Sequence, residues 1–101
     1  MHKELEKITK NKIKELELIL EGIQNDIEKT NYDIKMYEQD LIYYTKRIIL
    51  EQDKNNLKVL KQTLNYTKEN LNKLYKQEVK YNNDVVLIKN KKELLKLSIV
   101  L

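Results

Sequence analysis

The residues able to perform acid–base or nucleophilic chemistry are few in this chain and lie far apart. Its only His is His2 and its only Ser is Ser98, near opposite ends of the 101 residues. A nucleophile and the base that activates it must lie within hydrogen-bond reach, with the base oriented by a third group. A His at one terminus and a Ser in the opposite tail do not provide such a site. We therefore expect no catalytic residues and no enzyme activity.

Metal and cofactor chemistry also lacks its usual residues. The chain has sixteen acidic residues, so spacings such as Glu15 with Glu17 are expected by chance. A metal site in a helix bundle would need a Glu-x-x-His partner on a second helix, and the sequence offers none. The single glycine, Gly22, excludes a glycine-rich phosphate loop, and the lack of Cys excludes thiolate ligands. We expect no metal and no cofactor.

Lysine forms the one charged pattern that could bind a partner. The chain has nineteen Lys, a single Arg (Arg47) and a net charge of +4. A row of Lys can follow a phosphate backbone, but one Arg leaves almost no bidentate reader of bases. The row is therefore interpreted first as a solvated face and second as a face that contacts phosphates. Its residues are Lys54, Lys58, Lys61, Lys68, Lys76 and Lys80.

Two runs of seam residues, mostly apolar and spaced alternately by three and four, predict the elements that position all of these side chains. A period of 3.5 is typical of helices that bury a narrow stripe against other helices. The absence of Pro and the 36% of charged residues agree with long helices. The first run is Ile13, Leu16, Leu20, Ile23, Ile27, Thr30, Ile34, Tyr37, Leu41, Tyr44 and Ile48. The second is Leu57, Leu60, Leu64, Thr67, Leu71, Leu74, Glu78, Tyr81, Val85, Ile88, Lys92, Leu95 and Ile99.

The phase of the apolar pattern breaks between the two runs, in a polar segment. Asp53, Asn55 and Asn56 can cap a new helix there or tolerate a left-handed turn. The sequence predicts an all-α fold: an antiparallel helical hairpin, or coiled coil, in one domain over residues 1–101. One bent helix is the alternative, and residues 85–101 are interpreted as helix rather than strand. The predicted parts are a first arm over about 3–51, a turn over about 52–56 and a second arm over about 57–99.

Antiparallel pairing about the turn also predicts how polar residues meet. Thr30 shares a layer with Glu78, and such a polar layer costs stability but can fix the register. Lys92 lies opposite Leu16, where its long stem can reach outward. Pairs of opposite charge flanking the seams contribute about 0.2–1 kcal/mol each when exposed. The predicted pairs are Glu17–Lys89 and Glu38–Lys68.

Apolar residues outside the seams gather near the two chain ends. A helix that is apolar on more than one face needs more than one neighbour. Because a hairpin brings its ends together, we expect one patch, covered by a second copy in a four-helix bundle. The candidate patch is Leu5, Ile8, Leu18, Ile19, Val86, Leu87, Leu94 and Leu97.

These patterns favour a non-enzymatic coiled-coil module for protein–protein interaction, such as an adaptor, inhibitor or assembly factor. Its expected partners are an unidentified protein and a second copy of the chain. The alternative is a small basic regulator or architectural protein that contacts nucleic-acid backbones. No stretch approaches the length of a membrane span, and we expect no membrane partner and a cytoplasmic location, in a cell or in the host of a virus. Small secreted hairpins of the WXG type have a similar length, but this chain has no Trp for their Trp-x-Gly turn.

Overall fold

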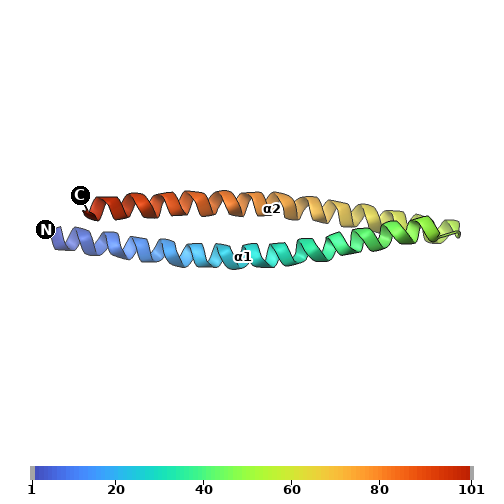
Figure 1. Ribbon diagram of the computed structural model, residues 1–101, viewed down its shortest axis with the longest axis horizontal. Coiled ribbons are helices and arrows are strands. Elements are labelled where there is room, and N and C mark those ends of the chain that lie inside the picture. Colours follow the sequence, from blue (N-terminus) through green and yellow to red (C-terminus); the bar gives the residue numbers. More distant parts are fainter. Residues whose placement is uncertain (1, 101) are drawn as a thin grey trace. The chain divides into compact units, whose positions relative to one another are not determined.

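The computed structural model describes residues 2–100 as two helices joined by a short turn (Figure 1). Helix α1 spans His2–Leu50, helix α2 spans Lys54–Val100, and residues 51–53 form the turn. This arrangement confirms the all-α class and the helical hairpin, and it excludes the single unbroken helix. The described part of the tail is helical, as predicted, and Leu101 lies outside the described residues. Side chains are described for residues 3–99.

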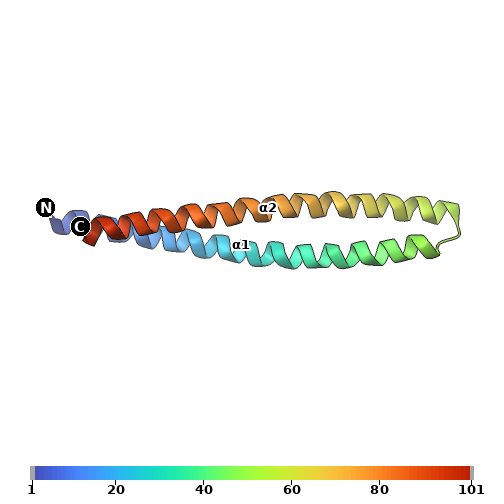
Figure 2. The ribbon, with the colours of Figure 1, turned by 45° about the horizontal axis from the view of Figure 1, so that its top comes forward.

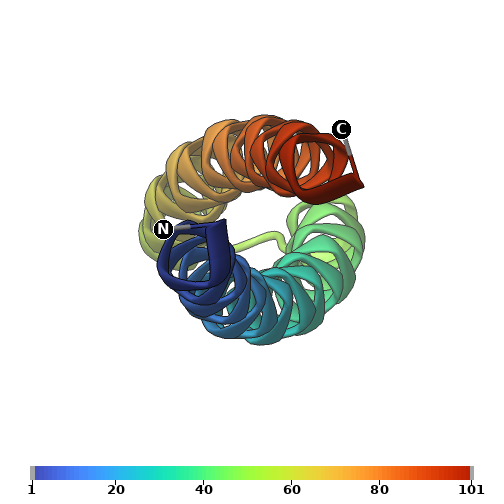
Figure 3. The same ribbon diagram turned by 90° about the vertical axis from the view of Figure 1, so that its left-hand side faces the viewer.

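The two helices contribute segments to two compact units. Unit 1 is formed by residues 1–28 and 79–101, and unit 2 by residues 29–78. In unit 1, whose segments of α1 and α2 are blue and orange to red in Figure 3, Lys92 Nζ lies 4.0 Å from a carboxylate oxygen of Glu17. In unit 2 the turn reverses the chain (Figure 2), and the Tyr75 hydroxyl donates a hydrogen bond of 3.3 Å to Glu38. Each unit therefore has its own polar link between antiparallel segments of α1 and α2.

The predicted seams are the buried stripes of the two helices. Every residue of both runs is buried or half-buried, whereas most other described residues are exposed. The buried apolar residues are Leu20, Ile34 and Leu71, and Thr30 and Thr67 are buried with them. The hydroxyl of Thr67 donates to the carbonyl of Thr63 at 2.9 Å, so its burial leaves no donor unpaired. A stripe of two positions in seven is enough to hold two helices together.

Two contacts beside the seam differ from those predicted. Glu17 pairs with Lys92 instead of Lys89, and Glu38 accepts a hydrogen bond from Tyr75 instead of pairing with Lys68. The Lys92 side chain is only 19% exposed, and its ammonium group reaches outward from the seam, as predicted. A lysine whose stem already lies in the seam reaches the flanking carboxylate at little further entropic cost. A lysine on the outer face must first be immobilised.

The turn is shorter than predicted because Asp53 caps the second helix at once. Helix α2 begins at Lys54, before the predicted start at residue 57. Asp53 Oδ1 accepts hydrogen bonds from the backbone N–H groups of Asn55 (2.8 Å) and Asn56 (3.1 Å). The Asp53 carbonyl accepts the first helical bond, from the N–H of Leu57 at 2.9 Å. These bonds satisfy donors that a helix start otherwise leaves unpaired.

Glu51 completes the turn from the other side. Its Oε1 accepts the backbone N–H of Asp53 at 3.2 Å, and its carboxylate lies 4.0 Å from the guanidinium of Arg47. In a capping box the back-bond to the cap N–H comes from a residue inside the helix. Here it comes from the residue two positions before the cap. No described residue has a positive φ, so the reversal uses no left-handed residue.

Replacing Asp53 by Ala should lower the free energy of unfolding by about 1 kcal/mol, and by at most about 2 kcal/mol, because two N–H groups lose their acceptor. Urea denaturation followed by circular dichroism measures the change. Asp53→Asn is the control, since it keeps a side-chain oxygen and ranks with Asp as a cap. Equal stability of the two variants would show that the cap contributes nothing.

Candidate functional site

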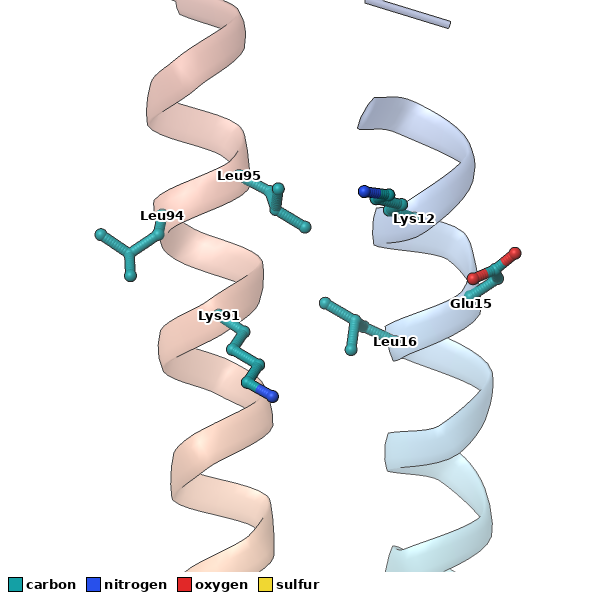
Figure 4. A pocket seen from close by; sticks show the side chains of 6 residues that line it. All are labelled: Lys12, Glu15, Leu16, Lys91, Leu94 and Leu95. Carbon is teal, nitrogen blue, oxygen red and sulfur yellow. The ribbon is translucent and has the colours of Figure 1, made fainter. Parts of the chain in front are cut away.

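In unit 1 a surface groove of about 440 Å³ opens between α1 and α2 (Figure 4). Leu16 and Leu95 point toward one another from the two helices and form its floor. Both are seam residues, yet both stay only half-buried. The groove leaves apolar surface of these two side chains uncovered. The full lining is Lys12, Glu15, Leu16, Lys91, Leu94 and Leu95.

Three charged side chains border the apolar floor. Lys12 and Lys91 extend toward the opposite helix, and Glu15, next to Leu16 on α1, points away from α2 (Figure 4). Within residues 3–99, none of these three takes part in an intramolecular ion pair.

Exposed apolar residues extend the groove along both helices. Leu5, Lys12 and Ile19 recur every seven residues on α1, and Leu87 and Leu94 do so on α2. Seven residues are close to two helical turns, so each set shares one face of its helix. Lys12 and Leu94 both line the groove, so the two faces border it, although the Leu94 side chain points away from α1 (Figure 4). Ile8 lies seven residues before Glu15, another residue of the groove lining, and so borders the groove as well. We call this surface the groove face; its apolar members are Leu5, Ile8, Ile19, Leu87 and Leu94, each more than half exposed.

The other three residues of the predicted patch are also exposed, but they lie on other faces of their helices. Leu18 precedes Ile19 and Val86 precedes Leu87, and one residue rotates a helix by about 100°. Leu97, three residues after Leu94, lies about 60° round α2 from it. The exposed fractions of Leu18, Val86 and Leu97 are 69%, 56% and 55%. The structure thus brings five of the eight predicted residues together on one face.

The groove itself was not predicted, since Leu16 and Leu95 were both assigned to the core. The sequence signal for it was Lys92, the residue predicted to face Leu16 in the seam. Its ammonium group lies 4.0 Å from a carboxylate oxygen of Glu17, beside the seam.

The predicted lysine row divides into separate parts. Four of its members follow one another at steps of four, three and seven and therefore share a face of α2 in unit 2. These are Lys54, Lys58, Lys61 and Lys68; all are exposed, and within the described residues none forms an ion pair. Lys76 is exposed on a different face of α2, and Lys80 is exposed in unit 1. We call the first four the lysine face.

Tyr75 continues the lysine face, seven residues beyond Lys68, and its hydroxyl reaches Glu38 on α1 at 3.3 Å. Partial removal from water and then the negative charge of Glu38 raise the pKa of the Tyr75 phenol. The neutral phenol is therefore the form that the fold favours. The contribution of this contact to stability is complete below the ordinary pKa of about 10 and is lost as the pH rises through the raised pKa.

Replacing Glu38 by Gln should lower the pKa of Tyr75 toward its ordinary value, because a nearby negative charge disappears. Nuclear magnetic resonance of labelled tyrosine rings during an alkaline titration measures this shift for Tyr75 alone. Glu69→Gln, an exposed change elsewhere in unit 2, is the control and should leave the Tyr75 pKa where it is. An unchanged Tyr75 titration in Glu38→Gln would refute the contact.

The two residues considered for catalysis have different outcomes. The Ser98 hydroxyl donates to the carbonyl of Leu95 at 2.7 Å, and the side chain of His2 lies outside the described residues. Within the described chain, no three His, Cys, Asp or Glu side chains gather in a way suited to a metal ion. Neither α1 nor α2, over the residues described, contains a stretch long and apolar enough to cross a membrane.

Comparison with known proteins gives no relative for this arrangement: no family model, no curated protein and no solved structure matches the chain significantly.

Proposed function

We propose that this chain is a non-enzymatic coiled-coil module that acts by binding other proteins, as an adaptor, inhibitor or assembly factor. The observation that carries the proposal is the groove face of unit 1. It combines an open apolar groove with five neighbouring apolar residues that are each more than half exposed. Contiguous exposed apolar surface with a polar rim is typical of surfaces that bind a protein partner.

The incomplete core of unit 1 supports the same proposal. Leu20 is the only buried apolar residue in the described part of unit 1. Its other seam residues, including Ile13, Leu16 and Leu95, are half-buried. A partner on the groove face would cover this surface and add the apolar burial that the two helices lack. The unpaired charges of Lys12, Glu15 and Lys91 would set the orientation of that partner.

A second copy of the chain is the simplest partner of this kind. Two copies, each contributing two helix segments, form a four-helix bundle with two-fold symmetry. The proposed location is the cytoplasm, because a chain without Cys depends on no disulfide and suits a reducing compartment.

A photoreactive amino acid placed at Leu94 tests whether the groove face contacts protein. Leu94 is 67% exposed on the groove face, and Leu18, at 69%, points away from it. In cells that express the chain naturally, irradiation should join the Leu94 probe to a protein and leave the Leu18 probe unjoined. No adduct at Leu94, or equal adducts at both positions, would contradict the proposal.

The lysine face of unit 2 supports a second candidate function, contact with nucleic-acid backbones. Its four lysines are exposed and, within the described residues, unpaired. If all four displace counterions, the logarithm of duplex affinity should fall with the logarithm of salt concentration with a slope of about −4. Titration of a duplex at two salt concentrations measures this slope. Absence of duplex binding at about 50 mM salt, where contacts with phosphates are strong, would exclude nucleic-acid binding as the function.

A further inference from the structure

The two compact units differ in how deeply their seams are buried. Four side chains of unit 2 are buried, two on each helix and one turn apart: Thr30 with Ile34, and Thr67 with Leu71. In unit 1 the only buried side chain among the described residues is Leu20, and the rest of its seam is half-buried. Unit 2 therefore has a buried layer on both helices, whereas unit 1 has a single buried residue on α1.

Two further features weaken unit 1. Gly22 lies inside α1, and glycine lowers the stability of a helix interior relative to alanine. Lys92 occupies a seam position, and its Nζ lies 4.0 Å from a carboxylate oxygen of Glu17, whose side chain is 51% exposed. An ion pair this exposed adds little stability, so it does not replace the apolar contact that a seam position otherwise provides.

The connectivity of the chain also makes the two units unequal. Unit 2 is one continuous segment, residues 29–78, which reverses at the three-residue turn (Figure 2). Unit 1 consists of two segments that are joined only through those fifty residues. When unit 2 is unfolded, pairing the segments of unit 1 closes a loop of fifty residues, which is on the order of a hundredfold less favourable than closing the short turn. Unit 1 therefore depends on unit 2, whereas unit 2 closes no long loop and does not depend on unit 1.

We propose that unit 1 is a clamp that opens on its own: its segments of α1 and α2 separate while unit 2 stays folded and keeps them joined. Opening exposes the seam side chains of both segments, among them Leu16 and Leu95, to a partner. The opening itself goes beyond the proposed function, and only its use in binding rests on that function.

Hydrogen exchange of backbone amides, followed by mass spectrometry of peptides, tests the order of opening. The full chain is measured at a concentration where sedimentation shows the 12.2 kDa monomer, so that no second copy covers unit 1. We expect amides of residues 13–27 and 81–95 to exchange at least about tenfold faster than those of residues 34–48 and 57–71. Equal protection of the two units would overturn the proposal, because it would mean that the hairpin opens only as a whole.

Two matched truncations test the dependence of unit 1 on unit 2. Leu20→Ala and Leu71→Ala remove the same atoms from buried positions of unit 1 and unit 2, which are 8% and 6% exposed. Leu20→Ala should speed exchange in unit 1 by at least about tenfold and leave exchange in unit 2 within about twofold of the original. Leu71→Ala should speed exchange in both units by at least about tenfold, because unit 1 cannot stay closed when unit 2 opens.

The opposite pattern of exchange would overturn the clamp. Acceleration of both units by Leu20→Ala, or of unit 2 alone by Leu71→Ala, would each show that unit 1 does not open by itself. If Leu71→Ala fails to fold, both units exchange rapidly as expected, and Leu20→Ala still decides the question. Loss of the clamp would leave the proposed function standing, because the Leu94 probe tests contact at the groove face separately.

Discussion

Replacing Ile34 by Ala is expected to lower the free energy of unfolding by about 2–5 kcal/mol. Ile34 is 6% exposed and belongs to the seam of unit 2, near the buried Thr30 on the same helix. The change removes apolar atoms from contact and leaves a cavity that two long helices cannot easily close. For a chain of this size, the expected loss shifts the thermal midpoint downward by about 8 °C or more.

Ile42→Ala is the matched control, because it makes the same chemical change on the same helix and in the same unit. Ile42 is 57% exposed, outside the seam, so its truncation should alter stability by no more than about 0.5 kcal/mol. Urea unfolding followed by circular dichroism compares the two variants. Equal effects would show that the seam is not the core of unit 2.

The seams could be predicted from the sequence because the spacing of apolar residues decides them directly. A residue such as Leu20 or Leu71 reaches the partner helix only from positions that recur every 3.5 residues. The polar member Thr67 is buried by the same rule, and its hydroxyl pairs with the carbonyl one turn back. Periodicity therefore determines burial even where the side chain is not apolar.

The position of the turn could be predicted from the sequence, but its length could not. Asp53, Asn55 and Asn56 are all good capping residues, and composition does not rank them. The choice depends on two further contacts, the bond from Glu51 to the Asp53 N–H and the bonds from Asp53 to the following N–H groups. Contacts of this kind differ by small energies, so the predicted turn was a few residues too long.

The exposed residues of the candidate site could be predicted from the sequence, but the groove could not. Residues such as Leu87 and Leu94 lie outside the seam, so their exposure follows from the same periodicity. The groove lies near Lys92, a seam residue whose ammonium group lies 4.0 Å from a carboxylate oxygen of Glu17. Rotamers of exposed ion pairs differ by a few tenths of a kcal/mol, which no spacing rule resolves.

Leu87→Glu is expected to weaken association through the groove face by roughly a hundredfold. Leu87 is 58% exposed in the free chain and would be covered by a partner. Burying a carboxylate without a partner costs about 3 kcal/mol or more, which corresponds to a hundredfold rise in Kd. The change should leave the free helix intact, because Glu is a good helix former and the position is open to water. Sedimentation of the purified chain over a range of concentrations measures the effect.

Val86→Glu is the control for Leu87→Glu. It distinguishes the loss of direct contact at the groove face from a general effect of added negative charge on association. Val86 is 56% exposed and adjacent to Leu87, but it points about 100° away round α2. Both variants change the net charge of the chain by the same amount and at nearly the same height on the helix. Long-range repulsion between copies is therefore matched, and only direct burial at the groove face differs. Val86→Glu should keep Kd within about threefold of the original, since an exposed rim charge changes affinity little. If the two variants weaken association equally, the partner does not lie on the groove face.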